Sequence, residues 1–300
     1  MSYKTCIVIA GPTAVGKTAV SIALAQHFKT SIISADSRQC FKELHIGVAK
    51  PSPEQLQLVK HYFIGSHSIT EDMNAGIFEQ YALGAVNEIF AEHDIAIMVG
   101  GTGLYIRAFC EGMDEIPATD MDVRAQINNH YNKEGLAWLQ NEIKVKDPQW
   151  YTWGEIQNPQ RIMRALEVVE QTGKSILSFQ KEKKVIRDFK IIKIGLTLPR
   201  QVLYQQINHR TDEMMRSGLE AEVRALMPYS GLNALQTVGY REIFEYLNGQ
   251  VDLPSAVESI KKNTRHYAKR QLTWFNKDES IQWFSPLDFN QLINYFKNLV

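Results

Sequence analysis

The sequence predicts an α/β fold in which helices flank a parallel sheet and a helical insertion domain interrupts it. Three observations support this prediction. Apolar, β-rich runs alternate with helical periodicity in the first third of the chain, a polar stretch without a convincing strand follows, and an apolar β-type run returns near residue 190. Strands that alternate with helices form parallel sheets, which bind ligands at the carboxyl ends of their strands.

The predicted elements follow in order along the chain. A strand at residues 6–10 leads through the loop GPTAVGKT into a helix, because the apolar residues after the loop fall at helical spacing. A second strand at residues 31–34 ends at ADSRQ. A third strand at residues 95–99 follows a helix at residues 78–92 and ends at GGTG. A fourth strand at residues 189–198 resumes the sheet, and the last third of the chain is mostly helical.

A change of pattern divides the chain into two predicted domains. The insertion is polar and helical, and it is interrupted by IPATD, DPQW and NPQ. We predict a core domain of residues 1–114 and 185–300, with helices in its C-terminal part, and a helical insertion domain of residues 115–184.

Composition excludes several classes of protein. The 300 residues include 33 basic and 33 acidic side chains, so no overall field attracts a nucleic acid or a membrane, and any such partner must meet local patches. Cys6, Cys40 and Cys110 have no C-x-x-C spacing and predict neither a zinc module nor a disulfide framework. Without a leader or an apolar run long enough to cross a bilayer, we predict a cytoplasmic protein with no membrane contact.

The first loop has the pattern G-x-x-x-x-G-K-[ST], which is formed by Gly11, Gly16, Lys17 and Thr18. It has the required context, a strand before and a helix after, so the sheet is P-loop NTPase-like. Glycines let backbone amides turn toward a phosphate at a helix N-terminus, the lysine supplies a cation, and the threonine hydroxyl can bind magnesium. The alternative is a structural glycine-rich turn. The loop does not decide whether the phosphates belong to a nucleotide.

The strand ends indicate chemistry other than nucleotide hydrolysis. A hydrolase usually has an acid there to hold the metal-bound water, whereas the run IAIMV ends in Gly100, Gly101 and Thr102. The acid that does end a strand is Asp36. It is either a functional carboxylate or the cap of a local turn.

Several arginines have both a functional and a structural interpretation. Arg161 and Arg164 share one face of a predicted helix, but Arg164 could simply pair with Glu167. Arg216 lies in the last turn of a helix that ends at Gly218, where a cation complements the helix dipole.

The segment KKNTRHYAKRQLTWF combines cations with aromatic residues and contains no acid. Its basic residues are Lys261, Lys262, Arg265, Lys269 and Arg270. Its aromatic side chains could stack on RNA bases or pack inside the fold.

Taken together, several stretches resemble one family, the bacterial tRNA dimethylallyltransferases, also called isopentenyl-tRNA transferases. They are GPTAVGKT, SADSRQ, IGVAKPSPEQ, VGGTGLYIRA, NPQRIMRALEVVEQTGK, MMRSGLEAEVRAL, VGYREI and TRHYAKRQLTWF. The resemblance runs in family order from residue 11 to residue 275 and so covers nearly the whole chain. Val48 is a departure, because many members have threonine there.

The resemblance implies that the enzyme transfers a dimethylallyl group from dimethylallyl diphosphate to N6 of the adenosine at position 37 of tRNA, next to the anticodon. The products would be N6-isopentenyladenosine and diphosphate. The loop would then bind the diphosphate of a prenyl donor, with Mg²⁺ on Thr18. The implied partner is the anticodon stem-loop of tRNA, and a monomer would suffice because one chain contains the whole site.

The resemblance also implies a set of site residues. Asp36 would accept the proton of the adenine amine, and Thr102 would orient that amine. The predicted diphosphate- or nucleotide-binding residues are Gly11, Pro12, Thr13, Ala14, Val15, Gly16, Lys17, Thr18 and Arg216. The predicted tRNA-binding residues are Asp36, Ser37, Arg38, Gln39, Thr102, Arg124, Gln160, Arg161, Ile162, Met163 and Arg164.

Two other functions remain as alternatives. A small-molecule or nucleoside kinase would also use a P-loop, an acid at a strand end and a helical insertion, and the loop alone favours it. A nucleotide-dependent RNA-binding switch would share these features without covalent chemistry.

Overall fold

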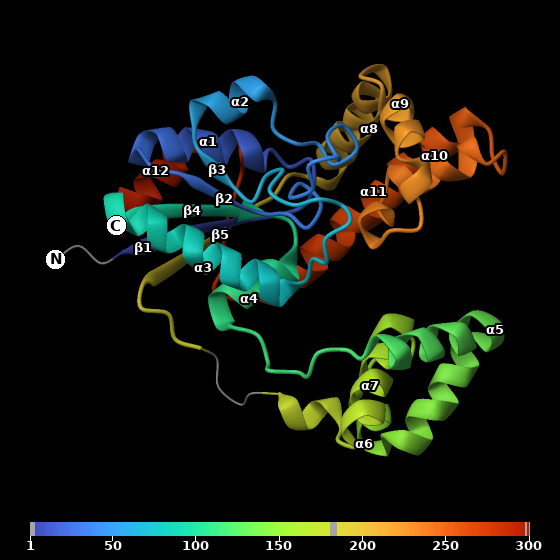
Figure 1. Ribbon diagram of the computed structural model, residues 1–300. Helices are drawn as coiled ribbons and strands as arrows, with labels where there is room; N and C mark the ends of the chain where they lie inside the picture. The colour runs from blue at the N-terminus through green and yellow to red at the C-terminus, as the bar shows by residue number, and fades with distance from the viewer. Residues whose placement is uncertain (1–3, 181–184, 298, 300) are drawn as a thin grey trace. The chain divides into compact units, whose positions relative to one another are not determined.

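The computed structural model describes residues 4–180, 185–297 and 299, which fall into two compact units (Figure 1). The core unit consists of residues 1–112 and 186–300, and the helical unit of residues 113–185. The helical unit thus starts two residues before the predicted insertion and ends one residue after it. Each unit has its own hydrophobic cluster.

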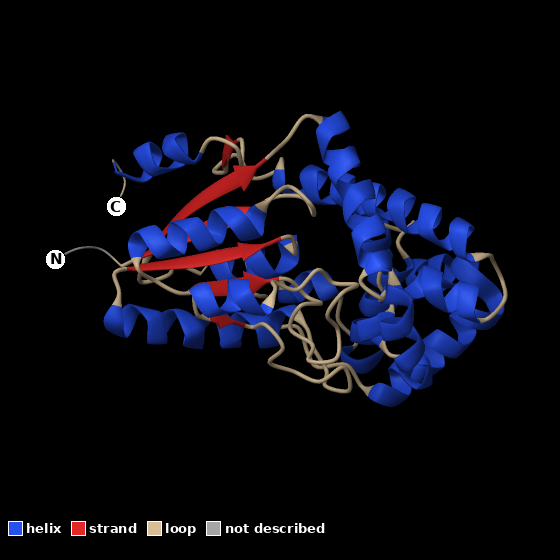
Figure 2. Cartoon of the chain, turned by 90° about the horizontal axis from the view of Figure 1, so that it is seen from above, coloured by secondary structure: helices blue, strands red, loops and turns tan. Residues whose placement is uncertain are grey.

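The described part of the core unit forms a six-stranded sheet in the order β3-β2-β4-β1-β5-β6, with every neighbouring pair parallel. The strands are β1 (Thr5–Ala10), β2 (Ile32–Ala35), β3 (His61–Tyr62), β4 (Ile95–Gly100), β5 (Lys190–Leu196) and β6 (Gln282–Phe284). The predicted α/β class with a parallel sheet is confirmed, and Figure 2 shows the strands with helices on either side of them.

The four predicted strands are present as β1, β2, β4 and β5. β1 is buried along its whole length between β4 and β5, which explains its nearly continuous apolar sequence TCIVIA. The sequence patterns do not predict β3 and β6, which have two and three residues. Strands this short at the edges of a sheet have no apolar run by which to recognise them.

Helices cover the sheet and carry the rest of the core unit. They are α1 (Lys17–Phe28), α2 (Pro53–Leu58), α3 (Ala75–Glu92), α4 (Gly103–Glu111), α8 (Arg200–Arg216), α9 (Leu219–Ala225), α10 (Tyr240–Leu247), α11 (Leu253–Phe275) and α12 (Phe289–Lys297), with short 3₁₀ turns η2 (Met227–Tyr229) and η3 (Asn233–Leu235). Ile7 and Ile9 of β1 share one cluster with Leu24 of α1, Ile207 of α8 and Phe296 of α12. α3 packs on β2, β4 and α4.

The helical unit contains α5 (Met121–Lys146), α6 (Pro148–Trp153), α7 (Pro159–Thr172) and the 3₁₀ turn η1 (Ile176–Phe179). No strand occurs among its described residues. α5 and α7 pack together through a cluster that includes Leu139, Ile143, Ile162 and Leu166. The φ angle of Gly135, 74°, interrupts the helical geometry of α5.

No helix in the described ranges combines the length and the apolar sequence that crossing a membrane requires.

Candidate active site

The loop between β1 and α1 has the backbone of a phosphate-binding loop. Gly16 (φ 97°) and Ala14 (φ 64°) are in the left-handed region, and backbones of this kind turn successive N–H groups toward an anion. Gly11 approaches β5 closely, since a Cβ there would lie 2.8 Å from the carbonyl oxygen of Leu196. Both glycines of the motif are therefore required by the shape of the loop.

Two partly buried cations lie beside this loop. The Lys17 amine donates hydrogen bonds to the carbonyl oxygens of Gly11 (3.0 Å) and Pro12 (2.7 Å), and Arg210 of α8 donates to the Thr13 hydroxyl. Burial lowers the pKa of Lys17 to about 7, an effect that the carboxylate of Asp36 opposes and Arg210 reinforces. Burial also lowers the pKa of Arg210. Two desolvated cations next to one carboxylate favour an anionic ligand.

Asp36 follows β2 and forms a local turn. Its Oδ1 accepts hydrogen bonds from the backbone N–H groups of Arg38 (2.9 Å) and Gln39 (3.3 Å). The structural interpretation of this acid is therefore confirmed, but it accounts for only one oxygen. The hydrogen bonds that the described residues donate to this carboxylate all end on Oδ1, and Asp36 lines the cavity beside the loop. The turn and a functional role are compatible.

Thr102 joins the end of β4 to the Asp36 turn. Its Oγ1 accepts a hydrogen bond from the Ser37 N–H (3.0 Å), and its own N–H donates to the carbonyl oxygen of Ala35 (3.2 Å). Gly100 allows this close approach, because a Cβ there would lie 2.1 Å from the same carbonyl oxygen. The glycines and hydroxyl of GGTG thus hold two strand ends together.

The Gln39 side chain fixes the neighbouring loop. Its Nε2 donates to the carbonyl oxygens of Val48 (3.2 Å) and Ala49 (3.0 Å). The same loop is held from the other side by Glu222, which accepts from the N–H groups of Ile46 (2.8 Å) and Gly47 (3.1 Å). Val48 therefore contributes its backbone to the site. No sequence pattern predicts this role of Glu222 on α9.

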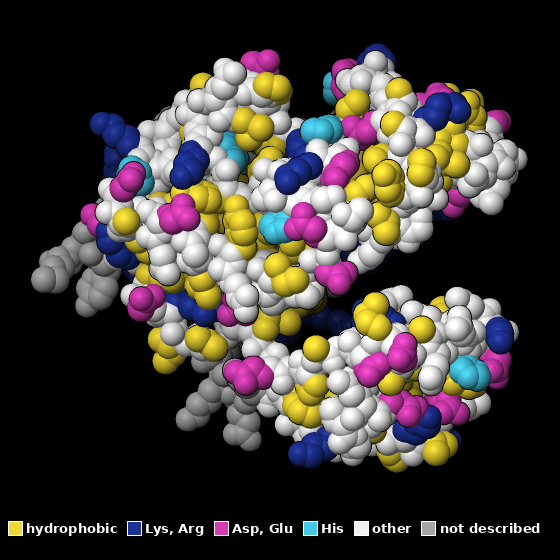
Figure 3. Space-filling view, viewed as in Figure 1, with side chains coloured by type: hydrophobic (Ala, Val, Ile, Leu, Met, Phe, Trp, Pro, Cys, Tyr) yellow, Lys and Arg dark blue, Asp and Glu magenta, His cyan; other side chains and the backbone are white. Residues whose placement is uncertain are grey.

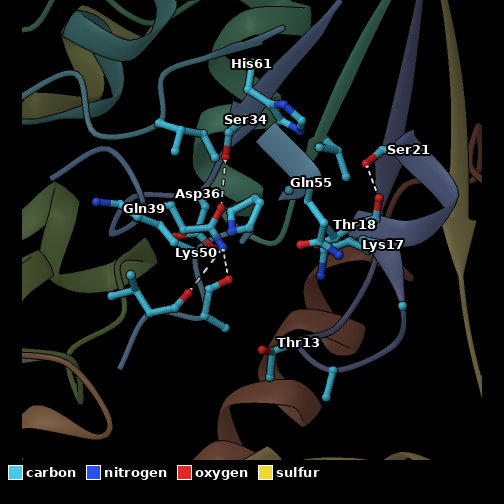
Figure 4. A pocket seen from close by; sticks show the side chains of 18 of the residues that line it. Thr13, Lys17, Thr18, Ser21, Ser34, Asp36, Gln39, Lys50, Gln55 and His61 are labelled. Carbon is cyan, nitrogen blue, oxygen red and sulfur yellow. Dashed lines mark hydrogen bonds between the residues drawn. The ribbon is translucent and has the colours of Figure 1, made fainter. Parts of the chain in front are cut away.

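Two adjoining cavities open at the carboxyl ends of the strands. The first, of about 410 Å³, extends from the P-loop to Asp36 and Gln39, and Figure 4 shows Thr13, Lys17 and Thr18 across from those two residues. The second, of about 300 Å³, is lined by the Asp36 turn and by α8, α10 and α11. The cavities share Thr13, Asp36 and Arg210. Asp36 therefore lies where a phosphate-binding cavity meets a second one.

Arg216 does not lie with the other predicted phosphate-binding residues. It lies in the last turn of α8, as the structural interpretation proposed, and its exposed side chain (64%) pairs with Glu213. It lines neither of the two cavities. Arg210 on the same helix occupies the expected place. The buried side of α8 contains Leu203, Ile207 and Thr211, so the helical pattern could have placed Arg210 at its margin.

The predicted tRNA-binding arginines of the helical unit are all paired with carboxylates. Arg124 and Arg164 both contact Glu167, at 2.8 Å and 3.2 Å, and Arg161 contacts Glu155 at 2.8 Å. Glu167 is nearly buried, with 4% of its side chain exposed. The predicted structural pair of Arg164 is therefore present, and any nucleic acid must compete with these carboxylates.

The predicted tRNA-binding positions other than arginine in α7 differ in exposure. Gln160 is exposed, whereas Ile162 and Met163 are buried in the cluster of the helical unit. The latter two side chains are therefore not available to tRNA in this structure, which corrects their predicted role. A helix that packs on one side cannot offer every residue of a continuous sequence motif to a partner.

The basic segment of α11 is partly used within the fold. Lys261 pairs with Asp212 (2.8 Å) and Arg265 donates to Asn208 (2.7 Å), while Tyr267 and Arg270 line the second cavity. On the face drawn in Figure 3, basic and acidic side chains are interspersed. On this face, a polyanion would therefore meet local groups rather than a continuous basic surface, in line with the balanced composition.

The P-loop fits a magnesium ion that arrives with a phosphate. Within the described ranges, no cluster of three or more histidine, cysteine or acidic residues could hold a metal. Magnesium commonly needs only one or two protein oxygens, because substrate phosphates and water supply the remaining ligands. The Thr18 hydroxyl and the Asp36 carboxylate line the first cavity and offer this kind of oxygen.

A phosphate-binding loop at the end of a central parallel strand defines a P-loop protein, and the missing strand-end acid after β4 separates it from ordinary nucleotide hydrolases. Comparison with known proteins identifies the group more closely. The model of the IPP transferase family matches residues 39–278. The chain belongs to this family and is a transferase.

Curated relatives and solved structures resemble the chain over nearly its whole length. A tRNA dimethylallyltransferase from Christiangramia forsetii is 49% identical, covering 92% of this chain and 91% of the relative. One from Bacteroides thetaiotaomicron is 45% identical, covering 98% and 95%. The full-length tRNA isopentenylpyrophosphate transferase of Bacillus halodurans is 32% identical with a TM-score of 0.72, covering 98% and 96%. A eukaryotic dimethylallyltransferase acting on tRNA is 26% identical with a TM-score of 0.80, covering 96% and 75%.

Proposed function

We propose that this protein transfers the dimethylallyl group of dimethylallyl diphosphate to N6 of adenosine 37 in tRNA. One carbon–oxygen bond breaks at C1 of the donor, one carbon–nitrogen bond forms, diphosphate leaves, and the amine loses a proton. The names of the relatives support the substrates. The observation that carries the proposal is the position of Asp36 between a cavity with two partly buried cations and a second cavity.

The first cavity suits the diphosphate of the donor. Negative charge grows on this leaving group as the bond at C1 breaks, and groups fixed in advance around it stabilise the transition state more than the ground state. In this proposal the loop amides, Lys17 and Arg210 supply that stabilisation. Thr18 would hold Mg²⁺, which supplies further neutralisation of the diphosphate when it is bound.

The second cavity suits the adenine. A base inside the anticodon loop must leave its stack to reach a reactive carbon in a pocket. Asp36 would then accept the proton of the N6 amine, which is a poor nucleophile because its lone pair is delocalised into the ring. Thr102 holds the Asp36 turn in place, and Arg38, Tyr267 and Arg270 line the path of the nucleotide.

Contacts with the rest of the anticodon stem-loop are proposed for the helical unit. Arg124, Gln160, Arg161 and Arg164 supply its polar and cationic groups, and each arginine would exchange a carboxylate for a phosphate. We propose a cytoplasmic reaction, which a tRNA substrate supports. A monomer suffices, because the core unit of one chain contains both cavities.

The decisive experiment is incubation of the protein with dimethylallyl diphosphate, Mg²⁺ and unmodified tRNA, followed by mass analysis of the nucleosides. We expect an adenosine heavier by one five-carbon unit, located next to the anticodon. Parallel reactions with ATP labelled in the γ-phosphate test the kinase alternative. Transfer of label to a product, with no prenylated adenosine, would overturn the proposal.

A further inference from the structure

A buried glutamine on α11 connects two of the strand ends that form the site. Gln271 is 6% exposed and lies on the buried side of α11 with Ala268 and Phe275. Its Oε1 accepts a hydrogen bond from the Thr13 N–H of the P-loop (2.8 Å). Its Nε2 donates to the Gly101 carbonyl oxygen at the end of β4 (2.9 Å).

The chemistry of the two partners explains why an amide occupies this place. One partner is a donor and the other is an acceptor, and a neutral carboxamide offers one group for each. A buried polar atom without a partner is costly, so both ends of the side chain are held where these backbones require them. Gln271 therefore acts as a spacer of fixed length between the P-loop and the end of β4.

The GGTG segment is shaped to receive this helix. A Cβ at Gly101 would lie 2.2 Å from Nε2 of Gln271, and a Cβ at Gly103 would lie 2.2 Å from the ring of Trp274. Two glycines thus admit two neighbouring side chains of α11. α11 therefore contacts the GGTG segment closely at two points, and we expect this to fix the distance between the helix and the end of β4.

Each end of the amide leads to a group with a proposed part in the reaction. On the P-loop side, the Thr13 hydroxyl accepts from Arg210. On the β4 side, Thr102 follows Gly101 and holds the N–H of Ser37, next to Asp36. Gln271 thus links two groups of the site. On one side it leads through Thr13 to Arg210, the cation beside the prenyl diphosphate, and on the other through Gly101 and Thr102 to the turn of Asp36, the proton acceptor.

We propose that Gln271 is a positioning residue that sets the distance between the departing diphosphate and the carboxylate of Asp36, an inference that rests on the proposed function. It touches neither reacting group and acts through Thr13 and Gly101. Loss of this spacing should slow the chemical step while leaving donor binding nearly intact, because the loop amides, Lys17 and Arg210 remain. Misplacement of reacting groups by about 1 Å can lower a rate by about a hundredfold.

Two substitutions test this role. Gln271→Met keeps the length of the side chain and removes both hydrogen bonds. Gln271→Glu makes the two hydrogen bonds depend on pH. A protonated carboxyl group has one donor and one acceptor, as the amide has, whereas the ionised form can only accept. Tyr267 contacts the same side chain, but burial raises its pKa to about 12, so it stays protonated at the pH values used.

The experiment measures single-turnover prenyl transfer to tRNA, with the rate expressed per donor-binding site and divided by the wild-type rate at the same pH. This ratio removes inactive protein and the pH effects that both proteins share, including those of the charged groups around Tyr267, which are Asp36, Arg38 and Arg270. For Gln271→Met we expect a rate about ten- to a hundredfold lower, with donor affinity changed less than about threefold. For Gln271→Glu the ratio should be low at high pH and rise toward one as the pH falls.

Gln140→Glu is the matched control, because Gln140 also donates to a backbone carbonyl oxygen, that of Ile156 in the helical unit (2.8 Å). Its ratio should not depend on pH. A purely structural role of Gln271 would lower the melting temperature and the number of donor-binding sites but leave the rate per site unchanged. That result, or a pH-independent ratio for Gln271→Glu, would overturn the inference. Absence of transfer by the wild-type protein would instead contradict the proposed function.

Discussion

The cations of the two units are held in opposite ways. In the core unit, Lys17 and Arg210 are partly buried beside the P-loop and donate hydrogen bonds to neutral oxygens, and the carboxylate of Asp36 acts on the charge of both. In the helical unit, Arg124 and Arg164 converge on the buried carboxylate of Glu167. Among the described residues, no carboxylate forms an ion pair with Lys17 or Arg210, whereas the arginines of the helical unit already have carboxylate partners.

This difference separates a site built for a ligand from a site that must rearrange. Desolvated cations gain most when an anion enters, because burial has removed the water that would otherwise stabilise them. Paired arginines gain less, since a phosphate only replaces a carboxylate. We therefore expect the largest effects of substitution in the core unit and smaller, salt-dependent effects in the helical unit.

Replacement of Asp36 should have the largest effect. Asp36→Asn keeps an oxygen that can accept from the N–H groups of Arg38 and Gln39, so the turn is retained while the proton acceptor is lost. We expect single-turnover transfer to fall about a hundred- to ten-thousandfold, with tRNA affinity nearly unchanged. Asp252→Asn is the control, because Asp252 caps α11 with the same kind of bond. A wild-type rate for Asp36→Asn would remove this residue from the reaction.

The second prediction compares two arginines on α8. Arg210→Met removes a charged hydrogen bond, which typically contributes about 1.5–3 kcal/mol, so kcat/KM for the donor should fall about ten- to a hundredfold. Arg216→Met removes an exposed ion pair worth about 0–1 kcal/mol and should lower it no more than about fivefold. Steady-state kinetics with varied donor decides between them. The reverse order would return Arg216 to the phosphate site.

The third prediction concerns the pH dependence of donor binding. The pKa of Lys17 is about 7 without ligand, and a bound diphosphate raises it. Above pH 7 the protein must therefore take up a proton on binding, so affinity should fall by up to about tenfold per pH unit until the pKa of the complex is reached. Calorimetry between about pH 6 and pH 9 measures this.

Lys17→Met serves as the reference for that titration, since only the ionisation of the donor remains in it. The same pKa affects stability. Because an unfolded Lys17 binds more protons than a folded one between pH 7 and 10.5, the contribution of this lysine to the stability of the unliganded protein should rise with pH through this window, relative to Lys17→Met. Parallel affinity curves for wild type and variant would contradict the assignment of the slope to Lys17.

The smallest expected effect lies in the helical unit. If Arg161 and Arg164 each neutralise one phosphate of the single-stranded loop, replacing both by alanine should flatten the dependence of log affinity on log salt by about 1.4, at about 0.7 per contact. Donor affinity should not change. Glu155→Gln frees Arg161 from its partner and should strengthen tRNA binding. An unchanged slope and affinity in the double variant would leave these arginines with a structural role only.

The same contrast explains what could be predicted from the sequence. The parallel sheet and the position of Asp36 follow from local patterns, since a buried strand and a phosphate loop each occupy a continuous stretch. Arg210 and Gln271 act from helices far along the chain, and only packing of α8 and α11 on the strand ends brings them to the P-loop. One sequence feature does indicate Gln271, because it is a polar residue in the otherwise apolar stripe of α11.

The three cysteines allow local opening of the core unit to be measured by chemical labelling. Cys6, Cys40 and Cys110 are the whole cysteine content, and all are buried in the core unit. Burial raises the pKa of Cys40 to about 12 and that of Cys110 to about 11. Because the thiolate is the reactive form, alkylating reagents should label the folded protein slowly. The rate at which Cys40, close to the Asp36 turn, is alkylated would therefore measure how often the region at the carboxyl ends of the strands opens. The same rate measured with diphosphate bound would show how much the ligand reduces this opening.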